Sequence, residues 1–165
     1  MSVLGQLTAA MAPWATFYSA SSPTQTLVTF GHFGGMMVAG GSAVAADRGI
    51  FEACRFAGSG RLRPLDELFK THRYVIAGLA VTSLSGLLML AADLENLAVS
   101  PWFWLKMGLL TLLLFNGWFM TEVARQLKRD GGLNQSLWNR LRRTAVISLV
   151  LWFAVVLAGT LLTTA

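Results

Sequence analysis

The sequence predicts an all-α integral membrane protein, a four-helix up-and-down bundle with both the N and the C terminus outside. Hydrophobic residues make up 55 % of the chain and charged residues only 13 %, and the mean hydropathy is +0.57. Soluble domains are less apolar and carry about twice that share of charge. Four apolar runs have the length of about 20 residues that crosses a bilayer core of about 30 Å. These runs are 27–46, 74–92, 101–124 and 144–163.

The distribution of basic residues predicts the orientation of the bundle. All lysines and arginines except Lys106 lie in or beside the connections between the first two and the last two spans. Residues 1–26 and 93–100 contain none. Basic loops stay on the cytoplasmic side of a membrane. We therefore expect a multi-pass protein of a bacterial-type inner membrane. The net charge of +5 is explained by this orientation and by contacts with anionic lipid headgroups, rather than by binding of nucleic acid.

The N-terminal segment 1–26 precedes the bundle, which spans 27–163. It has no basic residue, so it lacks the n-region of a secretory signal peptide. Its prolines, its aromatic residues such as Trp14 and its Ser/Thr-rich end suit a short segment at the outer membrane interface. A disordered tail is the alternative.

The first span carries a face of small residues and a single ionisable side chain. Gly31 and Gly35 form the close-packing pattern of membrane helices, and His32 lies on the shoulder of that face. We expect His32 to point into the bundle. Phe30, Phe33, Met37 and Val44 fall on the opposite face, which suits contact with lipid.

The connection 47–71 predicts a helix that continues to the interface and ends at 58–60, Gly-Ser-Gly. Cys54 falls in this connection and is expected to be a small apolar residue there. Pro64 begins the next helix. The second span has its own small-residue stripe from Gly78 to Gly86, and a short acidic loop, 93–100, follows it.

The third span opens at Pro101 with an aromatic belt, and Asp130-Gly-Gly predicts a turn before the last span. Trp138 is placed in that second basic connection. The last span contains no ionisable group and is interpreted as structural.

Candidate ligands gather at one depth in the outer half of the bundle. Helix rise places His32 and Met107 about 7.5 Å from the outer edge, and Met89 and Lys106 about 6 Å from it. Met36 lies one turn deeper than His32. This layer suits haem b with His/Met ligation, or copper(I) held by thioethers and His32. The alternatives are that the methionines are packing, that Lys106 reaches the headgroups and that His32 bonds a neighbouring helix.

His72 is excluded as a second ligand to the same haem. Helix rise separates it from His32 by about 20 Å along the membrane normal. The sequence has no phosphate-binding loop, Cys/His metal spacing, nucleophile motif or intramembrane carboxylate pair. This favours a chain that is not an enzyme by itself, without deciding the point.

Two stretches carry a family resemblance, over two of the four spans. One is His32, Gly34-Gly35 and Arg48; the other is Trp102, Leu105 and Lys106 followed by the leucines of 109–114. The chain resembles the copper-resistance-D proteins and the related bacterial membrane protoporphyrinogen oxidase. The resemblance implies haem b or copper handling by His32 and Lys106. In the oxidase, the corresponding region resembles Trp-Leu-His-x-Lys and ends in Tyr-His. Here Trp104 or Leu105 stands in place of the first histidine, and Phe115-Asn116 stands in place of the Tyr-His pair. The oxidase activity itself is therefore not implied.

The sequence leaves three functions open. The first is a redox centre, haem b by preference, bound near His32 for electron transport. The second is a cofactor-free accessory subunit of a larger membrane complex, or a homo-oligomer. The third is copper(I) handling or transport through His32, Met36, Met89 and Met107.

Overall fold

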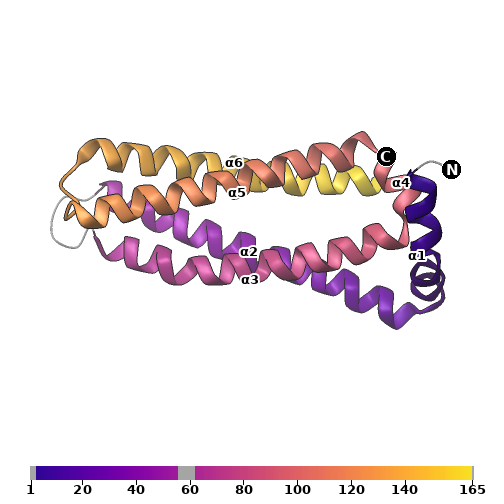
Figure 1. Cartoon of the computed structure of the whole chain (residues 1–165). Helices are drawn as coiled ribbons and strands as arrows, with labels where there is room; N and C mark the ends of the chain where they lie inside the picture. The colour runs from indigo at the N-terminus through magenta and orange to yellow at the C-terminus, as the bar shows by residue number, and fades with distance from the viewer. Residues whose placement is uncertain (1–2, 56–61, 165) are drawn as a thin grey trace.

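The computed structural model describes residues 3–55 and 62–164, and every regular element in these ranges is a helix (Figure 1). The all-helical prediction is confirmed. The helices are α1 (Val3–Ala20), α2 (Ser22–Arg55), α3 (Arg63–Ala92), α4 (Leu94–Val99), α5 (Pro101–Arg129) and α6 (Gln135–Thr164). Within the described ranges four of them, α2, α3, α5 and α6, are long and apolar enough to cross a membrane.

The four long helices form two antiparallel pairs. Helix α2 packs along α3, α5 packs along α6, and α2 also contacts α6, whereas α3 and α5 touch only briefly. Figure 1 shows both chain termini at one end of the molecule, beside α1 and α4. The end of α2, the start of α3 and the α5–α6 turn lie at the opposite end, which we call the basic end. The end with α1 and α4 is called the termini end.

Two glycines bring the backbones of α2 and α3 into direct contact. A methyl group on Gly35 would lie 2.7 Å from the carbonyl oxygen of Gly78 and 2.5 Å from Thr82 Oγ1. A methyl group on Gly78 would lie 2.6 Å from the carbonyl oxygen of Gly35 and 2.9 Å from the Cβ of Ala39. The predicted small-residue faces of the first two spans therefore meet each other. Phe30, Phe33, Met37 and Val44 are exposed, as their opposite face predicts.

The densest packing lies at the basic end. One buried cluster draws on all four long helices there, while a smaller one lies nearer the middle around Ala39, Leu113 and Trp152. No residue of either cluster comes from the layer of His32 and Lys106. The large cluster consists of Ile50, Ala53, Leu65, Leu68, Met120, Val123, Ala124, Leu127, Trp138, Leu141 and Ala145.

The α5–α6 turn explains why Trp138 is a core residue. Gly131 and Gly132 have φ of 63° and 77°, a left-handed conformation that glycine adopts without a Cβ penalty. The chain reverses there as Asp130-Gly-Gly predicts, and α6 already begins at Gln135. Trp138 is fully buried, and its Nε1–H donates to the Gly132 carbonyl at 3.0 Å. Placing Trp138 in a connecting loop was wrong, because the helix starts well before the apolar run.

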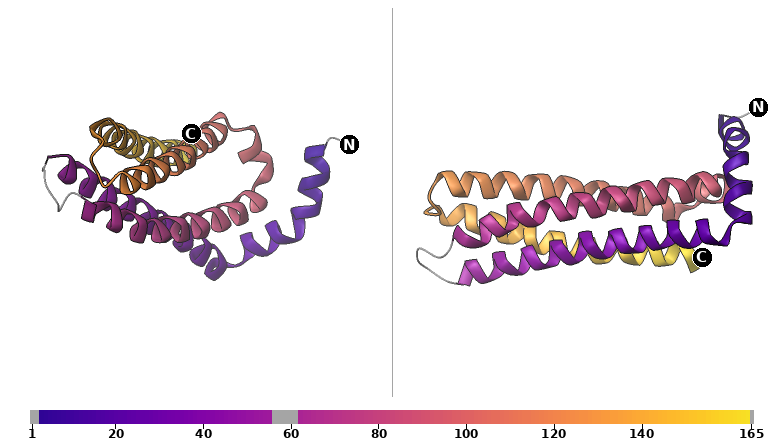
Figure 2. Two further views of the ribbon diagram at one scale, coloured as in Figure 1. Left: turned by 60° about the vertical axis from the view of Figure 1, so that its left-hand side comes forward. Right: turned by 90° about the horizontal axis from the view of Figure 1, so that it is seen from below.

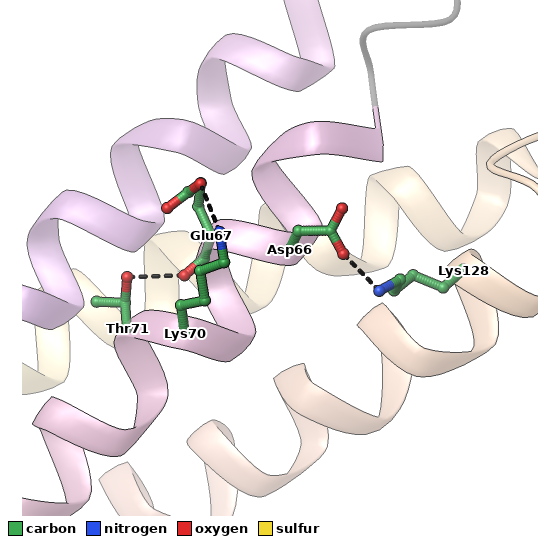
Figure 3. A network of polar contacts seen from close by, with 5 residues as sticks. All are labelled: Asp66, Glu67, Lys70, Thr71 and Lys128. Atoms are coloured by element: carbon green, nitrogen blue, oxygen red, sulfur yellow. Dashed lines mark hydrogen bonds and ion pairs between the residues drawn. The ribbon is translucent and has the colours of Figure 1, made fainter.

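An ion pair joins α3 to α5 at the basic end. Asp66 accepts a hydrogen bond from Lys128, while Lys70 pairs with Glu67 within α3 (Figure 3). Pro64 lies in the first turn of α3, as predicted. Cys54 lies within α2, against the core, rather than in a loop. The predicted stop at 58–60 falls outside the described residues.

The termini end carries two helices that the sequence did not predict. Residues 3–20 form α1, which Figure 2 shows lying across the end of the bundle. Trp14 Nε1–H donates to the Leu88 carbonyl of α3 at 2.9 Å, so α1 is held to the bundle. Residues 94–99, expected as a loop, form the short helix α4. Residues 3–20 thus form a helix here, whereas the sequence left open a disordered tail.

Candidate functional site

His32 of α2 points toward α3. Its Nδ1 lies 3.0 Å from the Thr82 carbonyl oxygen and 3.3 Å from Ser85 Oγ. A carbonyl oxygen accepts hydrogen bonds only, so Nδ1 carries the proton and the neutral ring has its lone pair on Nε2. His32 therefore points into the bundle, as its position on the helix predicts.

Gly86 leaves space for the imidazole. A methyl group on Gly86 would lie 3.2 Å from His32 Cε1 and 3.5 Å from Nδ1. Ser85 is buried and donates to the carbonyls of α3 within hydrogen-bond distance, so its hydroxyl is fixed beside the ring. Gly86 and Ser85 thus set the position of the histidine, and both belong to the small-residue stripe of the second span.

The Nε2 of His32 forms no hydrogen bond among residues 3–55 and 62–164. Histidines that bind metals usually donate the proton of the other ring nitrogen to a carbonyl or carboxylate, which fixes the ring and makes the ligating nitrogen more basic. His32 has this arrangement through Thr82. The side chain is half-buried, so the geometry is that of a candidate ligand rather than a surface residue.

Lys106 approaches the same layer from α5. A methyl group on Gly159 of α6 would lie 3.5 Å from Lys106 Nζ, which places the ammonium against α6. The lysine is half-buried and close enough to His32 for an electrostatic interaction between the two side chains. His32 and Lys106 are thus two predicted site residues that interact electrostatically.

The three methionines have different surroundings. Met36 on α2 and Met89 on α3 are half-buried. Met107 is 40 % exposed on α5. None of the three is a member of a buried cluster in the described chain. The sulfur ligands of a His/Met or thioether site therefore remain predictions.

No group of three or more histidine, cysteine, aspartate or glutamate side chains is close enough to hold a metal ion in the described residues. His72 lies on α3 toward the basic end and interacts electrostatically with Arg125 of α5. A centre at His32 therefore cannot be a multi-carboxylate or multi-histidine metal site built from these residues.

The sequence interpretation missed one ionisable residue in the bundle interior. Asp47 was taken as the first residue of a connection, but it lies within α2 and is fully buried. The signal was present in the spacing, because Asp47 follows the buried Ala39 and Ala43 at intervals of four. Helical periodicity thus places Asp47 on the buried face of α2.

Comparison of the chain with models of protein families, with curated proteins and with solved structures finds no match in any of the three.

Proposed function

We propose that this chain is a multi-pass membrane protein that binds haem b through His32 in the half of the bundle near its termini. The termini lie outside and the basic connections face the cytoplasm of a bacterial-type inner membrane. Electron transport is the function that such a centre supports. The membrane setting itself rests on four helices of sufficient length and apolarity in the described chain.

One observation carries the proposal: the Nδ1 of His32 is held by the Thr82 carbonyl at 3.0 Å, which leaves Nε2 as the donor atom. A histidine that holds haem iron through Nε2 would need this tautomer. The two core clusters consist of residues other than His32 and Lys106. Lys106 adds a cation at this depth, suited to one of the propionate groups of haem.

Bound haem would supply a reversible one-electron couple between ferric and ferrous iron. The chain contributes the rest. Thr82 and Ser85 hold the imidazole in orientation, and Gly86 keeps the space beside the ring open.

The test is an absorption spectrum of protein expressed with sufficient haem, purified in mild detergent, and recorded oxidised and then reduced with dithionite, with metal analysis of the same sample. The expected result is a Soret band that shifts and sharpens on reduction, and its loss in His32→Ala. His72→Ala is the matched control and should retain the full haem content. Haem content unchanged in His32→Ala ends the proposal, as does a featureless spectrum with the chain folded.

A different result would favour copper(I). This result would be copper bound in proportion to protein and lost when Met36, Met89 and Met107 are replaced by leucine. It would indicate that the chain handles copper rather than haem.

A second candidate function is a cofactor-free accessory subunit. Gly41 on α2 and Gly108 on α5 are exposed, and a methyl group on either would meet nothing within 4 Å in the described structure. Small residues on outward helix faces allow a second helix to approach closely. Replacing both by leucine should release a co-purifying partner or a second copy of the chain in mild detergent. An unchanged particle mass would count against this role.

A further inference from the structure

Asp47 is buried in the interior of the bundle without a hydrogen-bond partner. Its exposed fraction is 0 %, and neither carboxyl oxygen forms a hydrogen bond in residues 3–55 and 62–164. The residue lies on α2 between Ala43 of the middle cluster and Ile50 of the cluster at the basic end. A buried carboxyl group between two apolar clusters is the least expected side chain at this position.

An ionised carboxylate without a partner is very costly in an apolar interior, and such groups become neutral instead. A buried carboxylate is otherwise stabilised by a lysine or arginine in contact, or by several hydrogen bonds. Asp47 has neither. The protonated acid needs only one acceptor for its hydrogen and carries no net charge.

Within residues 3–55 and 62–164, no lysine, arginine or histidine interacts electrostatically with the Asp47 carboxyl group. On α6 the arginines are exposed, and His72 of α3 faces Arg125 of α5. The ion pairs are Arg48–Glu52 on α2, Lys70–Glu67 on α3, Arg125–Glu122 on α5, and Asp66–Lys128 between α3 and α5.

The polar group facing Asp47 is the hydroxyl of Ser148 on α6, which is itself buried. The two side chains face each other without forming a hydrogen bond of ordinary geometry. Thr144 lies one turn from Ser148 on α6, nearer to the basic end, and is also buried. The Thr144 hydroxyl donates to the Leu141 carbonyl of α6 at 2.8 Å, so a second buried polar group lies on α6 between Ser148 and the basic end.

We propose that Asp47 is a proton-binding site of the bundle interior. Its carboxyl group binds one proton and exchanges that proton with water at the basic end. The exchange is a simple dissociation of the acid into carboxylate and proton and needs no oxidant or reductant. Ser148 is the positioning residue, since its hydroxyl is the group that the acid can hydrogen-bond.

A metal cation is the competing occupant. Hard cations take six or more oxygen ligands, or keep several waters. No cluster of carboxylates, histidines or cysteines accompanies Asp47 within the described residues. The surroundings therefore favour the proton, and the experiment below separates the two.

Infrared spectroscopy of the full chain in lipid vesicles tests the proposal, because a protonated carboxyl group has a C=O stretching band separate from that of a carboxylate. The expected result in mildly acidic buffer is one such band that shifts in heavy water, is lost in Asp47→Asn, and gives way to a carboxylate band as the pH is raised. Asp66→Asn is the matched control, since Asp66 is exposed and paired with Lys128. That variant should leave the band unchanged.

Ser148→Ala provides a second measurement that a purely structural role would not affect. Removing the hydroxyl should shift the acid band to higher frequency while circular dichroism stays unchanged. This arm also decides the question if Asp47→Asn fails to fold. A band present in Asp47→Asn, no band shift in Ser148→Ala, or a carboxylate whose signal depends on added sodium or calcium would each overturn the proposal.

Discussion

Gly35→Ala should separate α2 from α3 and disturb the His32 site together with the fold. The new methyl group would lie 2.7 Å from the Gly78 carbonyl oxygen. Carbon–oxygen contacts in proteins begin near 3.3 Å, so the backbones must move apart by about 0.6 Å. Overpacking of this kind costs about 1–3 kcal/mol, set against a gain in helix propensity of about 1 kcal/mol for alanine over glycine. Thr82 Oγ1 is the nearest atom, at 2.5 Å, but the Gly78 oxygen and the Thr82 nitrogen belong to the backbone of α3, so rotation of the Thr82 side chain alone does not relieve the contact.

Gly34→Ala is the matched control, one residue away. A methyl group there meets nothing within 4 Å, so this variant should be as stable as the original chain or slightly more so. The assay is unfolding in detergent followed by circular dichroism. Gly35→Ala should unfold at the lower denaturant concentration or temperature, and Gly34→Ala should not. Equal stability of the two variants would refute the backbone contact between α2 and α3.

Three further predictions concern single contacts. Gly86→Ala should press on the His32 ring, because its methyl group would lie 3.2 Å from Cε1. The variant should bind less haem while its melting temperature stays nearly constant. Unchanged haem content would contradict the placement of the ring. Trp14→Phe removes the hydrogen bond to the Leu88 carbonyl, so amide hydrogen exchange in α1 should accelerate while the long helices keep their protection. Equal exchange rates in the variant and the original protein would show that other contacts hold α1 to the bundle. Asn116→Ala removes the hydrogen bond from Nδ2 to the Thr144 carbonyl at 3.0 Å and should cost about 1 kcal/mol of stability in detergent, whereas Asn139→Ala on the exposed face of α6 should cost nothing measurable.

The long helices could be predicted from the sequence because each depends on local information. Each of these signals is a property of a short stretch of sequence and needs no distant contact. They are the apolar runs of sufficient length, the prolines at helix starts (Pro64 and Pro101) and the glycines of Asp130-Gly-Gly. The contact face of α2 was predictable too, since Gly35 and the exposed Phe33 fall on opposite sides of a helix. Direct contact of Gly35 with Gly78 follows once the two helices are antiparallel neighbours.

Other features depend on tertiary contacts that one sequence does not contain. Residues 3–20 form a helix that docks through Trp14, although Pro13 lies inside it. Asp47 directly follows the apolar run of the first span, and Trp138 precedes that of the last span. The sequence around each residue is charged or amphipathic, which is also typical of a loop. Helix α6 starts well before the apolar run, and α2 continues beyond its own run, so both residues become buried. Hydropathy alone underestimates how far membrane helices extend past the bilayer core.

The orientation of His32 is likewise a tertiary property. The sequence places the imidazole on the inner shoulder of α2, but only the position of α3 provides the Thr82 carbonyl. The choice of tautomer, and with it the free Nε2, therefore depends on packing between the two helices. The methionines show the limit of depth arguments, because Met107 is at the right height and is nevertheless exposed.

Chemical rescue of a His32→Gly variant tests the central claim most directly. Removing the side chain leaves a space of imidazole shape beside Gly86 and Thr82, open to an added ligand. If Nε2 of His32 ligates haem, the variant should lose the Soret band of the original protein and regain it when free imidazole is added. A variant that keeps the original spectrum without imidazole would show that haem, if bound, is held elsewhere. Folded protein that never acquires the band, even in its original form, would contradict the account altogether.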